Sequence, residues 1–122
     1  MGSVPAFLLK RLYVKGSLKN TATGFALTIQ NTLAPGTIVG LDPLQIDGVS
    51  YPLQQTTATL PNGSQVSATA LSAASPQRFS VGDRVTIHVQ AQPLAAGLHK
   101  MIISPKTMEA GLLQVFAEDA IS

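Results

Sequence analysis

The sequence predicts an all-β fold, an antiparallel β-sandwich of about eight or nine strands. Short extended runs recur along the chain, and clusters of Gly, Pro and Asn separate them. No segment longer than about six residues follows the period of 3.6 that an amphipathic helix requires. A small barrel would produce the same pattern, so it stays open as the alternative architecture.

The N-terminal residues divide into an arm and the start of the domain. We expect residues 1–7 to form a flexible arm and residues 8–121 to form a single sandwich domain. From Leu8 onward apolar residues alternate with polar ones, and this alternation predicts a first strand up to Leu18, with Tyr13 on its wet face. Asn20–Gly24 then provides a turn.

The stretch Gly24–Tyr51 contains the clearest signals. Phe25–Asn31 predicts a strand that buries alternate apolar side chains, and Thr37–Leu41 predicts a second extended run. Asp47-Gly48 stands between two short apolar–polar–apolar triplets. Because both residues tolerate positive φ, this pattern predicts a hairpin with a type I′ turn.

Later segments continue the strand pattern with different strength. Thr56–Leu60 and Gln65–Ala70 flank a Pro-Asn-Gly-Ser turn, and their small side chains predict a peripheral flap. Residues 71–77 read as a loop or one helical turn. Further strands are expected at three places: Val85–Val89, Leu98–Ser104 (ended by Pro105) and Leu112–Phe116.

Composition excludes several classes of function. The chain has no cysteine, which removes disulfides, thiol nucleophiles and thiolate metal sites. Only 11% of its residues are charged, and the net charge of +2 lacks the dense basic face of a nucleic-acid-binding protein. There is no signal-peptide pattern and no apolar run of membrane-spanning length. We therefore expect a cytoplasmic protein that binds neither nucleic acid nor membrane.

No residue pattern predicts a catalytic centre. His88 and His99 are interpreted as ordinary surface or loop histidines, although a metal site using His88 and the nearby Asp83 is conceivable. Three acids, Asp42, Asp47 and Asp83, are explained by turns. The other three, Glu109, Glu118 and Asp119, are expected to be solvated near the C-terminus. The sequence thus predicts no catalytic, cofactor-binding or metal-ligating residue in this chain.

Two uncharged segments are candidates for a partner interface. The loop Asn31–Gly36 carries apolar residues between two strands, and Tyr51-Pro52 places an amphipathic ring after the hairpin. The competing interpretation of the loop is a structural turn with Leu33 folded inward. The candidate interface residues are Asn31, Leu33, Pro35, Gly36, Tyr51 and Pro52.

The order of several short motifs resembles the small (beta) subunit family of C-glycoside deglycosidases. These motifs include Gly-Ser-Leu-Lys-Asn-Thr (16–21), Gln-Asn-Thr-Leu-Ala-Pro-Gly-Thr-Ile (30–38) and Leu-Gln-Ile-Asp-Gly (44–48). Phe-Ser-Val-Gly (79–82), Gly-Leu-His (97–99) and Gly-Leu (111–112) follow in the same order. The resemblance covers roughly residues 8–121.

That resemblance implies an all-β, non-catalytic accessory subunit in a hetero-oligomer. The implied partner is an alpha subunit similar to sugar-phosphate isomerases, a TIM barrel with a divalent metal. The implied complex cleaves the carbon–carbon bond between an aglycone and a 3-oxo sugar. Two alternatives remain: a free-standing ligand- or carbohydrate-binding β module, and an independent metalloenzyme built on His88 or His99.

Overall fold

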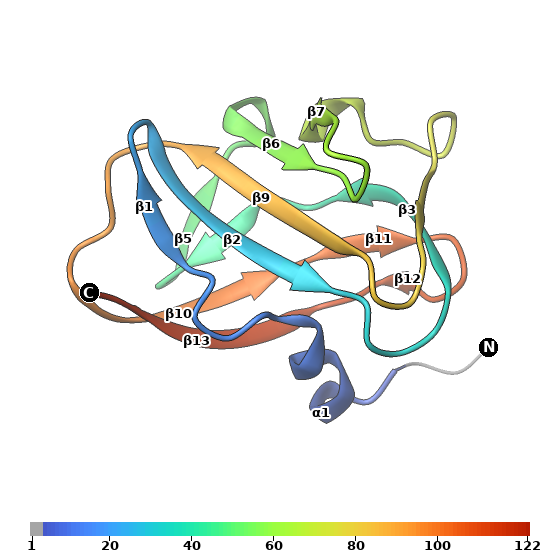
Figure 1. Ribbon diagram of the computed structural model, residues 1–122, viewed down its shortest axis with the longest axis horizontal. Coiled ribbons are helices and arrows are strands. Elements are labelled where there is room, and N and C mark those ends of the chain that lie inside the picture. Colours follow the sequence, from blue (N-terminus) through green and yellow to red (C-terminus); the bar gives the residue numbers. More distant parts are fainter. Residues whose placement is uncertain (1–3) are drawn as a thin grey trace.

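The computed structural model describes residues 4–122, and in this range the chain is an antiparallel β-sandwich (Figure 1). The first sheet has the strand order β1 (Lys19–Thr21), β2 (Gly24–Gln30), β9 (Arg84–Gln90), β6 (Thr56–Thr59), β7 (Gln65–Ser67). The second has the order β13 (Val115–Ile121), β10 (Gly97–Ile103), β4 (Leu44–Ile46), β5 (Val49–Tyr51). The third has the order β12 (Gly111–Leu112), β11 (Pro105–Thr107), β3 (Gly36–Leu41), β8 (Gln77–Phe79).

The predicted fold class is confirmed, and the sandwich is preferred over the barrel because the sheets of the described residues do not close. The expected number of strands was too low. This part of the chain forms thirteen strands, several of which have only two or three residues. Such short strands leave too few residues for an alternating pattern to be read from the sequence.

The core is centred on the pair β2–β9. Phe25, Leu27 and Ile29 of β2 are buried, as the alternation predicts, and they lie opposite Val89, Ile87 and Val85 of β9. Gly24 begins β2 where the backbones come close. A Cβ added there would lie 1.9 Å from the carbonyl oxygen of Val89, so only glycine fits.

The predicted first strand is wrong over most of its length. Ala6–Leu9 is a short α-helix, α1, and Lys10–Leu12 is a 3-10 turn that follows it; within the predicted strand, Tyr13 forms an isolated antiparallel bridge with Ile29. The first strand, β1, is Lys19–Thr21, and it takes in the start of the turn predicted at Asn20–Gly24. Leu9 and Leu12 are buried one turn apart, so tertiary packing against β13 selects a helical turn here. The arm predicted for residues 1–7 includes the start of α1, and residues 1–3 lie outside the described range.

The hairpin prediction is confirmed. β4 and β5 pair in antiparallel register around Asp47 and Gly48, whose φ angles are 52° and 83°. Positive φ at both central residues defines the type I′ turn. Asp47 is the one non-glycine residue with positive φ among those described.

Three later predictions need correction. The predicted flap corresponds to β6 and β7. β6 is not peripheral, since it pairs with β9 and buries Thr56 and Ala58, whereas β7 lies at one edge of the first sheet. β10 ends at Ile103, just before Pro105 as predicted, but Pro105 also begins a new strand, β11, in the third sheet. The last strand runs from Val115 to Ile121 and so includes Asp119, which was expected to be solvated.

The remaining short elements are the 3-10 turns η2 (Leu53–Gln55) and η3 (Ala68–Ala70). Residues 71–77, expected to be a loop or one helical turn, are irregular up to the start of β8. Within residues 4–122 no helix has the length and apolar character needed to cross a bilayer.

Candidate functional site

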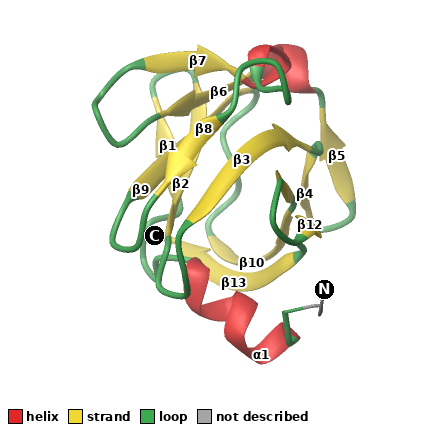
Figure 2. Cartoon of the chain, turned by 90° about the vertical axis from the view of Figure 1, so that its right-hand side faces the viewer, coloured by secondary structure: helices red, strands yellow, loops and turns green. Residues whose placement is uncertain are grey.

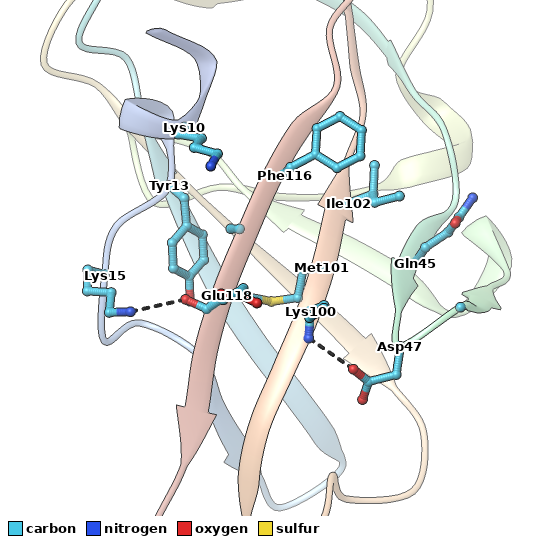
Figure 3. A pocket seen from close by; sticks show the side chains of 12 residues that line it. Lys10, Tyr13, Lys15, Gln45, Asp47, Lys100, Met101, Ile102, Phe116 and Glu118 are labelled. Atoms are coloured by element: carbon cyan, nitrogen blue, oxygen red, sulfur yellow. Dashed lines mark hydrogen bonds between the residues drawn. The ribbon is translucent and has the colours of Figure 1, made fainter. Parts of the chain in front are cut away.

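A large depression lies on the outer face of the second sheet, and we call it the hollow (Figure 3). It has a volume of about 780 Å³. Its lining comes from β4, β10, β13 and the residues that follow α1: Lys10, Tyr13, Lys15, Gln45, Asp47, Gly48, Lys100, Met101, Ile102, Phe116, Ala117, Glu118. A volume of this size falls within the range typical of small-molecule sites.

The middle of the hollow is apolar and its surroundings are basic. Ile102 and Phe116 are opposite each other in the β10–β13 register, so their side chains lie side by side on the outer face. The Phe116 side chain is exposed, at 45% of its maximum. Figure 3 shows Lys10 and Lys15 on one side of β13 and Lys100 on the other. An exposed ring between ammonium groups can bind an apolar body that carries negative charge.

A buried carboxylate holds the segment after α1 against β13. Asp119 Oδ2 accepts hydrogen bonds from the Tyr13 hydroxyl at 2.5 Å and from the Gly16 amide at 2.8 Å. Leu18 donates its amide to the Tyr13 hydroxyl at 3.1 Å. Burial raises the pKa of Asp119, but these donors outweigh it and hold the pKa below its ordinary value. The cluster therefore positions Lys10 and Lys15 beside the hollow.

The pKa of the Tyr13 hydroxyl is raised far above its ordinary value, first by burial and then by the bond to Asp119. The hydroxyl therefore stays protonated and donates to the carboxylate. The sequence pattern placed Tyr13 on a wet face, and the structure buries it. The prediction of a wet face for Tyr13 is therefore wrong, because the hydroxyl binds the carboxylate of Asp119, which lies 106 residues away in the sequence.

An ion pair lies at the other side of the hollow. His99 Nδ1 lies 2.6 Å from Asp47 Oδ2, and His99 Nε2 lies 2.7 Å from the Ala95 carbonyl oxygen. Both neighbours are acceptors, and both ring nitrogens can donate to them only when the imidazole is protonated, so this arrangement favours the charged form of His99. The Ala95 carbonyl and then the Asp47 carboxylate raise the pKa of His99, against the effect of burial.

Asp47 therefore does more than form a turn. Its Oδ1 accepts the Lys100 amide at 2.9 Å, and this bond, followed by the one from His99, lowers the pKa of the carboxyl group. The pair joins the β4–β5 hairpin to β10. His99 is buried in the sandwich, which corrects its interpretation as a surface or loop histidine.

A second open surface lies at one end of the sandwich, where three turns meet; we call it the tip (residues 31–36, 80–83 and 107–111). The backbone of Asn31 links the first two turns. Its N–H donates to the carbonyl oxygen of Asp83 at 2.9 Å, and its carbonyl oxygen accepts the N–H of Gly82 at 2.7 Å. Its side-chain amide donates to the carbonyl oxygens of Phe79 and Ala34. The third turn is connected to the first by the N–H of Met108, which donates to the carbonyl oxygen of Thr37, the residue after Gly36. Figure 1 shows these turns at the right-hand end of the sandwich, which is the end that faces the viewer in Figure 2.

The tip presents apolar side chains to solvent. Val81 is 56% exposed, Met108 is 59% exposed, and Pro35 is exposed as well. Beside Pro35 is a small hollow of about 240 Å³ with Arg78 and Glu109 on its walls. Glu109 accepts the hydroxyl and the amide of Thr37, and these two bonds lower its pKa. The tip is therefore a rigid apolar surface with a charged border.

The candidate interface residues from the sequence occupy different environments. Asn31 is buried, Leu33 is half-buried against the core, and Pro35 is exposed. Gly36 begins β3 at the small hollow. Tyr51 is half-buried with its ring edge-on to Phe25, and the adjacent Pro52 is exposed. Their role at an interface stays a prediction.

The other histidine lies apart from both surfaces. His88 Nε2 is within hydrogen-bond distance of the hydroxyl groups of Thr21 and Thr23, at 2.9 and 3.1 Å. Asp83 instead accepts the Ser80 amide in its own turn. Among residues 4–122 no three His, Asp or Glu side chains converge in a group that could hold a metal ion.

Sequence reasoning missed the residues of the hollow. The alternation that predicts a strand does continue from Val115 through Ala117 and Asp119 to Ile121. The predicted strand ends at Phe116, and the acids Glu118 and Asp119 that follow it are expected to be solvated. Extending the alternation would have placed Phe116 and Glu118 on one outer face.

The fold and its surfaces define an all-β sandwich domain with a lysine-bordered hollow and an apolar tip. The model of the family described as hydroxymethylglutaryl-CoA reductase, N-terminal domain, matches residues 8–122, and the chain belongs to this family. No curated protein matches the chain.

This match overturns the resemblance to the small subunit of C-glycoside deglycosidases, which is wrong. The motifs that carried it are turn and strand patterns, and such patterns recur in unrelated antiparallel sandwiches because they follow backbone geometry. The specific expectations of carbon–carbon bond cleavage, an isomerase-like alpha subunit and a divalent metal in that subunit rested on the resemblance alone. They lose their basis with it.

Proposed function

We propose that this chain is a non-catalytic domain that docks through its tip on the catalytic part of a larger enzyme. The observation that carries the proposal is the tip itself. Three turns distant in sequence lie at one end of the sandwich, and each of them exposes an apolar residue: Pro35, Val81 and Met108.

The chemistry of the tip supports a protein partner. Exposed apolar residues with a polar border are typical of interfaces between protein domains. The turns are held by hydrogen bonds of Asn31 and Thr37, so docking would not require them to become ordered. The sparse charge of the chain is also suited to a surface that is covered.

The family supports the nature of the partner. Its description names the N-terminal domain of a reductase, and such a domain works beside the remainder of its enzyme. We infer that the partner is the catalytic portion of a reductase of this type. The sequence carries none of the catalytic motifs sought above, so the chemistry is assigned to the partner.

Affinity purification of the tagged chain from its own cells, with substitution of the tip, tests the proposal. We expect a larger polypeptide to copurify and its yield to fall about tenfold in Val81→Asp, because a carboxylate would be buried at the interface. The matched control is Val49→Asp, since Val49 is 54% exposed and lies in the β4–β5 hairpin, away from the tip. Equal loss in both variants, or no loss in Val81→Asp, contradicts docking at the tip.

A second candidate function is a ligand-binding module, and the hollow is the specific observation that favours it. The two functions use different surfaces and do not exclude each other.

A further inference from the structure

We propose that the hollow on the outer face of β4, β10 and β13 binds a small amphipathic anion: an aromatic body that bears a carboxylate or another acidic group. The site is separate from the tip and does not depend on docking there.

The first argument concerns the exposed ring. Phe116 lies on the outer face of β13, together with Glu118 and Ala120, and all three residues are exposed. No other part of the sandwich within residues 4–122 therefore covers the ring. Its register partner Ile102 is half-buried and extends the apolar area across two strands. A flat ligand of one or two rings would cover both side chains and remove their apolar surface from water.

The second argument concerns charge. Three of the eight Lys and Arg residues of the chain line this one hollow: Lys10, Lys15 and Lys100. None of these three ammonium groups has a carboxylate within salt-bridge distance among the described residues. Lys15 Nζ donates to the backbone carbonyl of Glu118 at 3.2 Å, which directs it along β13. A ligand anion would therefore add a partner that these lysines lack.

The third argument concerns the acids at the same place. Asp47 also lines the hollow, but its carboxylate is occupied by the protonated ring of His99 and the Lys100 amide. Glu118 is the one other carboxylate in the lining. The hollow therefore keeps an excess of positive charge, which selects for anions over neutral or cationic ligands.

The fourth argument concerns rigidity. The segment that carries Lys10 and Lys15 is held to β13 by the bonds of Tyr13 and Gly16 to Asp119. The strand that carries Lys100 is held to the hairpin by Asp47. Both sides of the hollow are thus fixed in the absence of a ligand, and a preformed site loses less entropy on binding.

The test uses 2-naphthoate as the probe and 2-naphthamide as the neutral control with the same aromatic body. Amide chemical shifts of the isotope-labelled chain are followed by NMR during titration. We expect saturable shifts for 2-naphthoate at Lys100, Ile102, Phe116 and Glu118, with at least tenfold weaker binding of 2-naphthamide. Shifts spread over the whole surface, or equal affinity for both compounds, would overturn the proposal.

Substitutions distinguish the effect of the lysines in the hollow on 2-naphthoate binding from the effect of the net charge of the chain. The triple variant Lys10→Gln, Lys15→Gln, Lys100→Gln should bind 2-naphthoate at least tenfold more weakly. A control triple, Lys19→Gln, Arg78→Gln, Arg84→Gln, removes the same charge from exposed positions outside the hollow and should bind within twofold of the original chain. Equal weakening in both triples would show nonspecific attraction and overturn the site.

The ring is tested by Phe116→Ser, which should abolish measurable binding while the spectrum of the folded chain persists. If the chain shows no saturable shift with 2-naphthoate, the hollow is no small-anion site, whatever the result of Val81→Asp at the tip. Retained naphthoate binding with no copurified partner would overturn the docking function alone.

Discussion

The tip and the hollow are both open surfaces, but they are built in opposite ways. The tip consists of turns: neutral groups of the buried Asn31 side chain hold the first two together, and the exposed Glu109 carboxylate ties the third to Thr37. The hollow lies on strands, and carboxylates hold its two sides: Asp119 on one and Asp47 on the other. The difference means that the support of the hollow depends on pH and that the central support of the tip does not.

The sign of this pH dependence follows from the directions of the pKa shifts. The lowered pKa values of Asp119 and Asp47 stabilise the fold above their unfolded values of about 3.9, and this contribution is lost as the pH falls through the folded pKa values. The raised pKa of His99 stabilises the fold below about 6.5, and this is lost as the pH rises through its folded value.

The largest effect is expected for Asp119→Ala. The substitution leaves the Tyr13 hydroxyl and the Gly16 amide without their acceptor, and hydrogen bonds to buried charged groups contribute about 1.5–3 kcal/mol each. We expect the free energy of unfolding in urea to fall by about 3 kcal/mol. The control is Glu118→Ala, an exposed acid on the same strand, which should change it by less than about 0.5 kcal/mol. Equal losses would show that Asp119 does not anchor the segment after α1.

A smaller loss is expected for Asn31→Ala at the tip. The Phe79 and Ala34 carbonyl oxygens would lose a donor, which costs about 2 kcal/mol for neutral groups in a partly buried loop. Because no charge is involved, the loss should be the same at pH 4, 6 and 8. Urea unfolding at the three pH values measures it. A loss that varies with pH would remove the contrast with the hollow.

His99→Gln should cost about 1 kcal/mol near pH 5.5 and less above neutrality. The cause is that the original histidine loses one ring proton as the pH rises through its raised pKa, so that one of its ring nitrogens then presents a lone pair to an acceptor. Asp119 lies opposite His99 in the β10–β13 register and Lys100 is adjacent, so their charges contribute to the same profile. The double variant with Asp47→Asn should show losses smaller than the sum of the two single losses. Additive losses that do not change with pH would contradict the ion pair.

The smallest effect is expected for Glu109→Gln at the tip. Glu109 is exposed, and glutamine keeps one of the two acceptors that Thr37 uses. The urea midpoint should shift less than in Asn31→Ala. If the two shifts are equal, the border of the tip holds the three turns as strongly as Asn31 does.

The sequence predicted the parts of this fold that local pattern controls. The alternation of Phe25, Leu27 and Ile29 and the Asp47-Gly48 turn were correct because each needs only near neighbours. The segment from Leu8 to Leu18 was wrong because its conformation depends on Asp119, more than a hundred residues away. The role of Asp47 was incomplete for the same reason, since His99 lies 52 residues further along.

The candidate site follows the same rule. The loop Asn31–Gly36 could be predicted as a candidate interface because the sequence shows apolar residues in an uncharged segment between two strands. Its combination with Val81 and Met108 required the fold, because these turns meet only through hydrogen bonds to Asn31 and Thr37. The hollow depends on lysines from the segment after α1 and from β10, and their spacing in the sequence carries no sign of proximity.

The central claim is that the tip contacts a protein and that the hollow does not. Photocrosslinking tests it most directly, with benzoylphenylalanine placed at Val81 in one variant and at Phe116 in another, inside cells that produce the chain. We predict one discrete larger adduct from position 81 and none from position 116. An adduct from position 116 with none from position 81 would contradict the account.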